Sequence, residues 1–175
     1  MMVAAVARVA ERARDQAILY VVLGEDAPTE RTGQAEIRFV AYQKDPSAVA
    51  RYYQAADVYL HAARADTFPS SVIEAMACAT PVVATAVGGI PEQVDDAQTG
   101  FLVRPGDAEA LATRLSQVLS DDNLKCRMGM QAAEVARRRF DLHLQVNSYL
   151  EWYQEIIQAG SLAGKRTAQA CVAQL

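Results

Sequence analysis

The chain has 175 residues, of which 51% are hydrophobic and 22% charged, and its formal net charge is −4. This length is enough for one domain with a sizeable core, and no run approaches the roughly 20 apolar residues of a membrane-spanning helix. An acidic chain with no basic stripe and only 7% aromatic residues is a poor match for a nucleic-acid-binding protein.

The first third of the chain predicts helices and strands in turn. Apolar residues recur at helical spacing near the start, and the continuous apolar run that ends at Gly24 is typical of a strand buried on both faces. Asp45 followed by Pro46 indicates a helix start, a capping side chain and then proline at the first position. We expect residues 25–35 to form a loop or a frayed helix. The predicted elements are helices at 2–15 and 46–55 and strands at 17–23 and 37–40.

The same alternation continues to the end. A helix is expected to begin at Ser70 or Ser71 through a capping hydroxyl, and Asp107 is expected to cap another. Alternating strands and helices favour an α/β fold, a three-layer Rossmann-like parallel sheet over residues 1–158, with 159–175 as a flexible tail. The further predicted elements are strands at 58–60, 81–84 and 101–103, and helices from 70, from 91, at 108–119, 121–138 and 142–158.

Two carboxylates flank the start of the helix that begins near Ser70. Asp66 lies in the loop after a predicted strand, and Glu74 follows seven intervening residues later, about one turn inside the helix. Such folds bind ligands at the carboxyl ends of their strands, and a helix start offers unpaired N–H groups and partial positive charge to a phosphate. Carboxylates accept hydrogen bonds from sugar hydroxyls, so the pattern suggests a nucleotide-sugar. The strand–turn–helix setting disfavours a glycosidase pair.

The segment from Asp66 to Glu92 carries a family resemblance. It reads acidic-Thr-Phe-Pro-x-x-Val-Ile-Glu-Ala-Met-Ala-Cys-x-Thr-Pro-Val-Val-Ala-Thr-x-Val-Gly-Gly-Ile-Pro-Glu. It resembles the donor-binding region of retaining glycosyltransferases of group 1 (family 4), which have the two-Rossmann GT-B fold. Their hallmark is Glu-x7-Glu, whereas this chain has Asp66-x7-Glu74. A looser resemblance runs from about Val3 to Tyr153 and implies the C-terminal half of such an enzyme.

The resemblance implies roles for individual residues. Glu74, at the second acid of the motif, would hydrogen-bond the donor ribose, and Asp66, at the first acid, would lie against the donor sugar; these two are the implied catalytic residues. No metal or other cofactor is implied beyond the nucleotide-diphosphate sugar, which is a substrate. A tight turn is the plain interpretation of the two consecutive glycines. The implied donor-binding residues are Thr67, Phe68, Pro69, Ser70, Ser71, Val72, Gly24, Glu25, Tyr42, Gln43, Gly88 and Gly89.

Three positions qualify the resemblance. Pro69 lacks an N–H, so one donor of the phosphate site is missing. Ala79 stands where the family has glycine, and a left-handed backbone there would cost roughly 1 kcal/mol. His61 follows a strand at the binding edge, but no Cys or Asp partner is evident from the sequence, so a structural or solvated histidine is equally favoured.

We therefore predict the donor-binding part of a retaining hexosyltransferase that is N-terminally truncated, lacks the first strand and is inactive alone. Its partners would be an NDP-sugar, the missing acceptor domain or a separate subunit, and a lipid-linked, polysaccharide or small-molecule acceptor. A non-catalytic nucleotide-sugar-binding subunit and a sugar-nucleotide epimerase are alternatives. The three separated cysteines, Cys78, Cys126 and Cys171, fit a reducing compartment and indicate a cytoplasmic location. The absent domain would place the enzyme at the inner face of the membrane as a peripheral protein.

Overall fold

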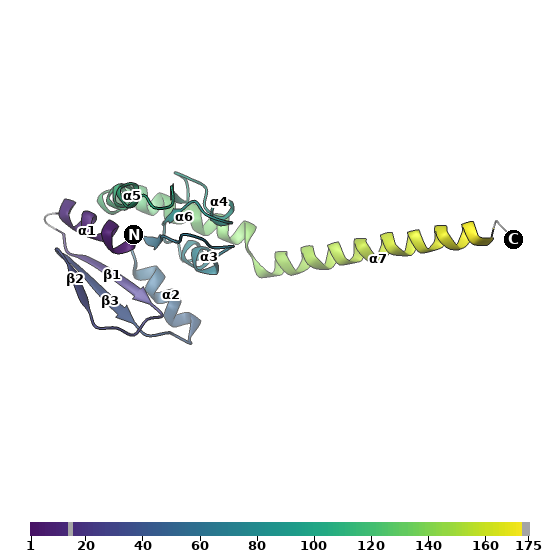
Figure 1. Cartoon of the computed structure of the whole chain (residues 1–175), viewed down its shortest axis with the longest axis horizontal. Coiled ribbons are helices and arrows are strands. Elements are labelled where there is room, and N and C mark those ends of the chain that lie inside the picture. Colours follow the sequence, from purple (N-terminus) through teal and green to yellow (C-terminus); the bar gives the residue numbers. More distant parts are fainter. Residues whose placement is uncertain (14–15, 173–175) are drawn as a thin grey trace. The chain divides into compact units, whose positions relative to one another are not determined.

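The computed structural model describes residues 1–13 and 16–172, with side chains up to residue 159, and divides into two compact units, Met1–Arg137 and Arg138–Leu175. The predicted α/β fold is confirmed, and Figure 1 shows its elements in chain order. The helices are α1 (Met2–Arg12), α2 (Pro46–Ala55), α3 (Ser70–Ala77), α4 (Ile90–Gln93), α5 (Ala108–Ser120), α6 (Asp122–Arg139) and α7 (Leu142–Val172). The strands are β1 (Ile18–Leu23), β2 (Glu30–Thr32), β3 (Ala35–Val40), β4 (Tyr59–His61), β5 (Val82–Thr85) and β6 (Gly100–Val103).

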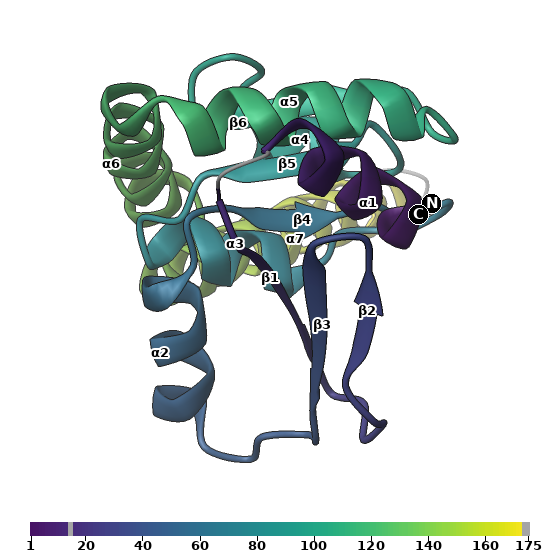
Figure 2. The same cartoon turned by 90° about the vertical axis from the view of Figure 1, so that its left-hand side faces the viewer.

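The strands form two three-stranded sheets, in the orders β1-β3-β2 and β4-β5-β6. The pairs β1–β3, β4–β5 and β5–β6 are parallel, as predicted, so within each sheet the following loops leave from the same edge. Figure 2 shows β1, β3 and β2 side by side, with α1 across one end of them. The expected loop is confirmed for residues 25–29 but is wrong for residues 30–35, because β2 pairs antiparallel with β3 through a turn at Gly33, whose φ is +59°.

The second sheet is buried on both faces and has the predicted layers, whereas the expectation that β1 is buried on both faces is wrong, because none of its residues is buried and Leu19 is 51% exposed. Val83 on β5 belongs to a cluster with Leu111 of α5 and Met128 of α6. Its neighbours Val82 and Ala84 belong to the opposite cluster, which contains residues of α3 and α4. Successive side chains of a strand point to opposite faces, so the apolar residues 82–84 of β5 are what a sheet between two helical layers requires.

The two sheets meet beneath α1. Ile18 of β1 and Leu60 of β4 pack against the same small cluster of Val6, Ala10 and Ala35. In the strand orders, β1 and β4 are each the edge strand of their sheet, so each has one side with no strand paired to it among residues 1–13 and 16–172. An open edge next to a buried apolar cluster is a place where a further strand can pair.

The end of α3 confirms a special backbone position. Ala79 has φ +59°, its N–H donates to the Met76 carbonyl at 3.0 Å, and the Thr80 N–H donates to the Ala75 carbonyl at 3.0 Å. These two bonds form the Schellman motif, in which glycine normally occupies the left-handed residue. Ala79 therefore carries the strain that the sequence predicted.

Replacing Ala79 by glycine should stabilise the protein by about 1 kcal/mol, because glycine adopts this backbone without a Cβ clash. Urea unfolding of the two proteins measures the difference. The matched control is Ala77→Gly, two residues earlier at the exposed last position of α3, which should destabilise by about 1 kcal/mol through lost helix propensity. A loss of stability in Ala79→Gly would contradict the strain.

The last helix, described as a unit by itself, is longer than predicted. The Asp141 carboxylate caps its start by accepting hydrogen bonds from the N–H groups of His143 at 2.9 Å and Leu144 at 3.1 Å. The helix then continues to Val172 instead of ending near Gln158. Residues 173–175 of the predicted tail lie outside the described residues, and the flexibility of that tail stays a prediction. None of the described helices combines the length and the apolar character that crossing a membrane requires.

Candidate functional site

The acidic loop, residues 62–69 between β4 and α3, lies against the glycine turn that follows β5. The Gly89 N–H donates to the Thr67 carbonyl at 2.7 Å. Gly88 has φ +51°, and a Cβ added to it would overlap the carbonyl oxygen of Asp66, while one on Gly89 would overlap the Thr67 carbonyl and the Phe68 ring. Both glycines are therefore required by close backbone approach, and the structure brings the predicted donor-binding turn to the predicted acidic loop.

The start of α3 differs from the prediction in its cap. Neither serine is the N-cap: Ser70 is the first helical residue, and Pro69 precedes it with extended angles of φ −65° and ψ 122°. Proline suits this boundary because its fixed φ allows an extended residue to lead into the helix. The Val72 N–H already donates to the Pro69 carbonyl at 3.3 Å. This leaves the Ser70 and Ser71 N–H groups as the better candidates for an anion, since first-turn amides lack intrahelical partners.

Glu74 lies one turn inside α3, as predicted, and its side chain meets α2. The Tyr53 hydroxyl donates to Glu74 Oε2 at 3.3 Å. Tyr53 itself is buried, with its ring edge-on to that of Tyr59 at a centroid distance of 5.5 Å, and its backbone carbonyl accepts from the Thr80 hydroxyl at 2.7 Å. The Glu74 residue remains exposed, so its carboxylate keeps acceptor capacity toward solvent or a ligand while one oxygen is held.

Burial raises the pKa of the Tyr53 hydroxyl, and the nearby Tyr59 and Glu74 raise it further. Burial also raises the pKa of Tyr59. Unfolded tyrosine ionises near pH 10, whereas these folded residues resist ionisation. Their contribution to stability is therefore complete below about pH 10 and is lost as the pH rises toward the folded pKa.

We expect the free energy of unfolding to fall steeply above about pH 10, and Tyr53→Phe to flatten that fall. Chemical denaturation at a series of alkaline pH values measures both slopes. Tyr42→Phe is the matched control, because Tyr42 is 75% exposed and should leave the slope unchanged. An unaltered slope in Tyr53→Phe would show that Tyr53 is not the group that titrates.

The structure gives His61 the aspartate partner that the sequence did not reveal. Its Nε2 lies 3.3 Å from Asp66 Oδ2, and its Nδ1 lies 3.1 Å from the Tyr59 hydroxyl. The sequence expectation that His61 lacks an Asp partner is therefore wrong, because the acidic loop turns back toward the end of β4. The spacing of Tyr59 and His61, two residues apart and thus on one face of a strand, was the signal available in the sequence.

Two buried polar residues that the sequence analysis missed hold the acidic loop. The Thr85 hydroxyl at the end of β5 donates to the Ala63 carbonyl at 2.7 Å. Gln93 of α4 is fully buried and donates through Nε2 to the Pro69 carbonyl at 3.1 Å. The loop is thus fixed at both ends by side chains of the neighbouring βα unit, which is the support that a preorganised binding site needs.

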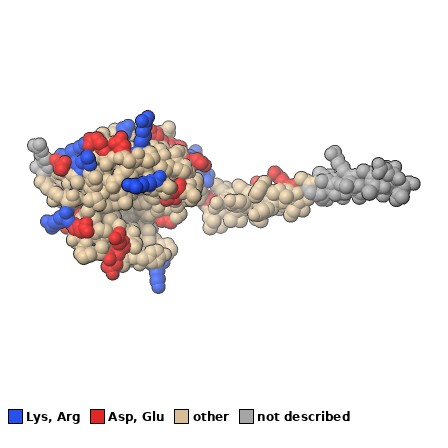
Figure 3. Space-filling view, viewed as in Figure 1, with Lys and Arg blue, Asp and Glu red and all other residues tan. Residues whose placement is uncertain are grey.

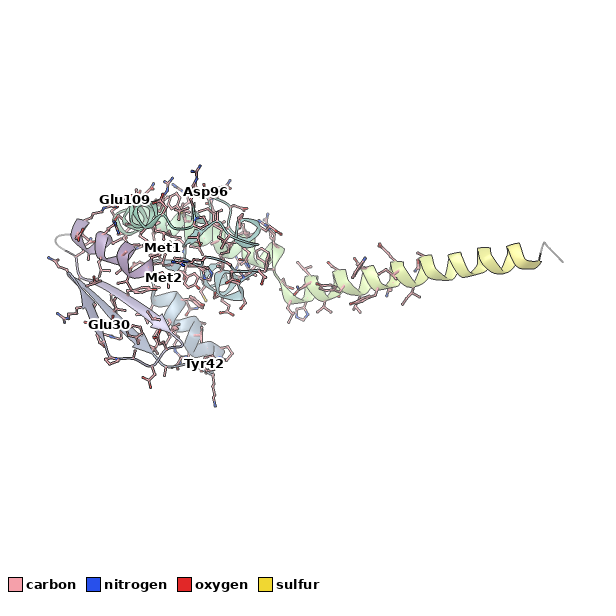
Figure 4. The ribbon with its side chains drawn as sticks, viewed as in Figure 1. Met1, Met2, Glu30, Tyr42, Asp96 and Glu109 are labelled. Carbon is pink, nitrogen blue, oxygen red and sulfur yellow. The ribbon has the colours of Figure 1, made fainter. Side chains whose placement is uncertain are left out.

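The other predicted donor-binding residues lie elsewhere in unit Met1–Arg137. Gly24 has φ +96°, and its N–H donates to the Val40 carbonyl at 2.9 Å, which places Glu25 beside the end of β3. Tyr42 projects outward beyond β3 (Figure 4), and Gln43 donates through its side chain to the Ala41 carbonyl at 2.7 Å. No hydrogen bond of the described residues joins these four to the acidic loop, so their donor contact stays a prediction.

The charges around the site are mixed. Figure 3 shows basic and acidic residues interspersed over the visible face of the first unit. In the described part of the chain, no group of three His, Cys, Asp or Glu side chains gathers in a way that would hold a metal ion. The groups at the site offer hydrogen bonds: carboxylate acceptors for hydroxyls and helix-start amides for an anion.

The matches to known proteins cover most of the chain. The family described as "Glycosyl transferases group 1" matches residues 1–135. The D-inositol 3-phosphate glycosyltransferase of Corynebacterium jeikeium is 33% identical over 132 residues, which are 75% of this chain and 31% of that protein. The matched part of the chain covers less than a third of the length of this protein and of a similar N-acetyl-alpha-D-glucosaminyl L-malate synthase from Bacillus anthracis.

Solved structures agree in fold. The sucrose-phosphate synthase of Thermosynechococcus elongatus is 28% identical with a TM-score of 0.71, over 89% of this chain and 43% of that one. The Anabaena protein Alr3699/HepE, solved in complex with UDP, is 27% identical with a TM-score of 0.64, over 68% of this chain and 32% of that one. The shared architecture is that of GT-B glycosyltransferases.

Proposed function

Because the chain belongs to the group 1 glycosyl transferases, we propose that it is the donor-binding part of a retaining hexosyltransferase. Such an enzyme moves a hexose from an NDP-sugar to a hydroxyl of a lipid-linked, polysaccharide or small-molecule acceptor. The observation that carries the proposal is the arrangement around the start of α3, where the acidic loop, the Gly88-Gly89 turn and Glu74 come together. The UDP complex of the Anabaena relative supports a nucleotide-sugar as the donor.

Each part of this arrangement has a role in the proposal. The Ser70 and Ser71 amides bind the diphosphate, because they point from a helix start that carries partial positive charge. Glu74 accepts hydrogen bonds from the ribose hydroxyls through the carboxylate that Tyr53 holds in place. Asp66 lies against the hexose and stabilises the positive charge that develops at the anomeric carbon, which is electrostatic catalysis at a preorganised site. No step requires a metal ion.

The remainder of the enzyme supplies the acceptor site and cationic groups for the leaving diphosphate. The open edges of β1 and β4 support this proposal, since a strand from outside these residues can pair between them and cover Ile18 and Leu60. We propose a cytoplasmic protein, which the free thiols of Cys78 and Cys126 support, with membrane association through that other part. Alone, the chain binds donor but transfers sugar poorly or not at all.

Calorimetric titration of the chain with UDP-, GDP- and ADP-hexoses tests donor binding, with the free nucleoside as control for a contribution from the diphosphate. A transfer assay with the complete enzyme then follows the anomeric configuration of the product by NMR, and retention is expected. Binding by the chain with no transfer until a partner subunit is added would favour the non-catalytic subunit. Turnover of a free NDP-hexose without acceptor would favour the epimerase, and absence of NDP-sugar binding in the complete enzyme would refute the proposal.

A further inference from the structure

His61 occupies an unusual place between two functional groups of the acidic site. Its side chain is 15% exposed, and its Nε2 is buried with no hydrogen bond of normal geometry within the described residues. The only charged group paired with it there is the Asp66 carboxylate, 3.3 Å from Nε2, whose side chain is 31% exposed. A buried N–H beside a carboxylate has that carboxylate as its available acceptor, and leaving either group unpaired would cost about 1–3 kcal/mol.

The other ring nitrogen, Nδ1, lies beside a hydroxyl that can donate a hydrogen bond to it. Tyr59 contributes a hydroxyl 3.1 Å from His61 Nδ1, and Ser71 in the first turn of α3 makes a side-chain hydrogen bond to that tyrosine. A neutral imidazole that accepts at Nδ1 must carry its proton at Nε2. With that tautomer, the hydrogen-bond donors point in one direction, from the Ser71 hydroxyl to the Tyr59 hydroxyl, to the imidazole, and finally to the Asp66 carboxylate.

We propose that His61 is a positioning residue that donates from Nε2 to Asp66 and holds that carboxylate at the donor sugar. This inference rests on the proposed function for the role of Asp66, although the contact itself does not. An aspartate is one methylene shorter than the glutamate of the Glu-x7-Glu pattern, so its carboxylate lies closer to the backbone and to the end of β4. The imidazole reaches it there and couples the acidic loop to the first turn of α3.

The first test reads the tautomer of His61 in this chain by ¹⁵N NMR, at a pH where imidazole is neutral. We expect a protonated Nε2 and a hydrogen-bonded, unprotonated Nδ1. Tyr59→Phe should remove the Nδ1 acceptor signature and mix the two tautomers, while His143, exposed on α7, serves as an internal reference. A proton on Nδ1 in the unmodified chain would overturn the proposal, because Nε2 would then have no proton to donate to Asp66.

The second test is a double-mutant cycle in the complete enzyme. We expect His61→Leu to lower kcat about tenfold with little change in donor KM, as for one lost hydrogen bond to a charged group. In the Asp66→Asn background, His61→Leu should have almost no further effect on kcat. In the otherwise unmodified enzyme, His61→Gln, which keeps an N–H donor, should retain most of the kcat that His61→Leu loses. Equal losses in both backgrounds would identify a general structural role and overturn the proposal.

The two tests separate failure of this inference from failure of the proposed function. If no variant and no unmodified enzyme turns over an NDP-sugar, the proposed function fails, yet the tautomer of His61 still decides the contact with Asp66. If the enzyme is active but the tautomer is reversed or the cycle is additive, only the positioning role fails. Cooperative urea unfolding of His61→Leu and Tyr59→Phe, with each variant fully folded without urea, would exclude loss of the fold as the cause of either result.

Discussion

Replacing Glu74 by alanine is expected to lower kcat/KM for the nucleotide-sugar about a hundredfold in the complete enzyme. The carboxylate is proposed to accept hydrogen bonds from the ribose hydroxyls, and a hydrogen bond to a charged group is worth about 1.5–3 kcal/mol. Two such bonds, reduced by water that fills the truncated site, give a loss of roughly 3 kcal/mol, which corresponds to a factor of about a hundred. Steady-state kinetics with varied donor concentration measures the loss, which should fall mainly on donor KM.

The controls for this prediction separate charge from shape. Glu74→Gln keeps the length of the side chain and should lower kcat/KM less than Glu74→Ala does. Tyr53→Phe should produce a smaller loss of the same kind, because it removes only the hydroxyl that holds Glu74 Oε2. Glu11→Ala, at an exposed position of α1, should leave the kinetics unchanged. Wild-type kinetics in Glu74→Ala would contradict the assignment of the donor site.

The second large effect is expected at Gly88. An alanine there would place its Cβ on the carbonyl oxygen of Asp66, a rigid backbone atom, at a residue whose φ is +51°. Left-handed strain costs about 1 kcal/mol and the overlap a further 1–3 kcal/mol, so Gly88→Ala should lower the free energy of unfolding by about 2–4 kcal/mol. The displaced acidic loop should also weaken donor binding, which calorimetry with UDP measures.

Gly33→Ala is the matched control for backbone strain alone. Gly33 has φ +59°, close to that of Gly88, but an added Cβ there would meet open space. Gly33→Ala should therefore lower the free energy of unfolding by only about 1 kcal/mol and should bind UDP as the unmodified chain does. If both replacements cost the same and neither affects UDP binding, the contact between the glycine turn and the acidic loop does not matter for the site.

Much of the fold could be predicted because local signals agree with the packing. The Asp45 side chain accepts from the Ser47 N–H at 2.9 Å and Asp107 caps α5, both as their sequence positions indicated. The strand β2 could not be predicted, because it has only three residues, Glu30–Thr32, two of them charged and exposed. This strand forms because it pairs with β3, and its own sequence has no alternating hydrophobic pattern that would predict it.

The candidate site likewise has parts that the sequence predicted and parts that it did not. Asp66, Glu74 and the glycine turn belong to one continuous motif, so the sequence placed them together. Ser70 or Ser71 was expected to cap α3, but Pro69 occupies the N-cap position. A cap depends on local dihedral angles that two adjacent serines do not specify. The contacts of Tyr53 with Glu74 and of His61 with Asp66 depend on how α2 and the loop after β4 fold back. Tertiary packing alone creates them.

The measurement that tests the central claim most directly is the mapping of UDP onto the chain by amide NMR. We predict that titration with UDP shifts the backbone amides of Ser70 and Ser71 most, with further shifts at Thr67 and in the Gly88-Gly89 turn. Uridine without phosphates should leave the two serine amides unshifted, because the helix start recognises the anion. Large shifts confined to other elements, with α3 and the acidic loop unchanged, would contradict the assignment of this site as the donor-binding site.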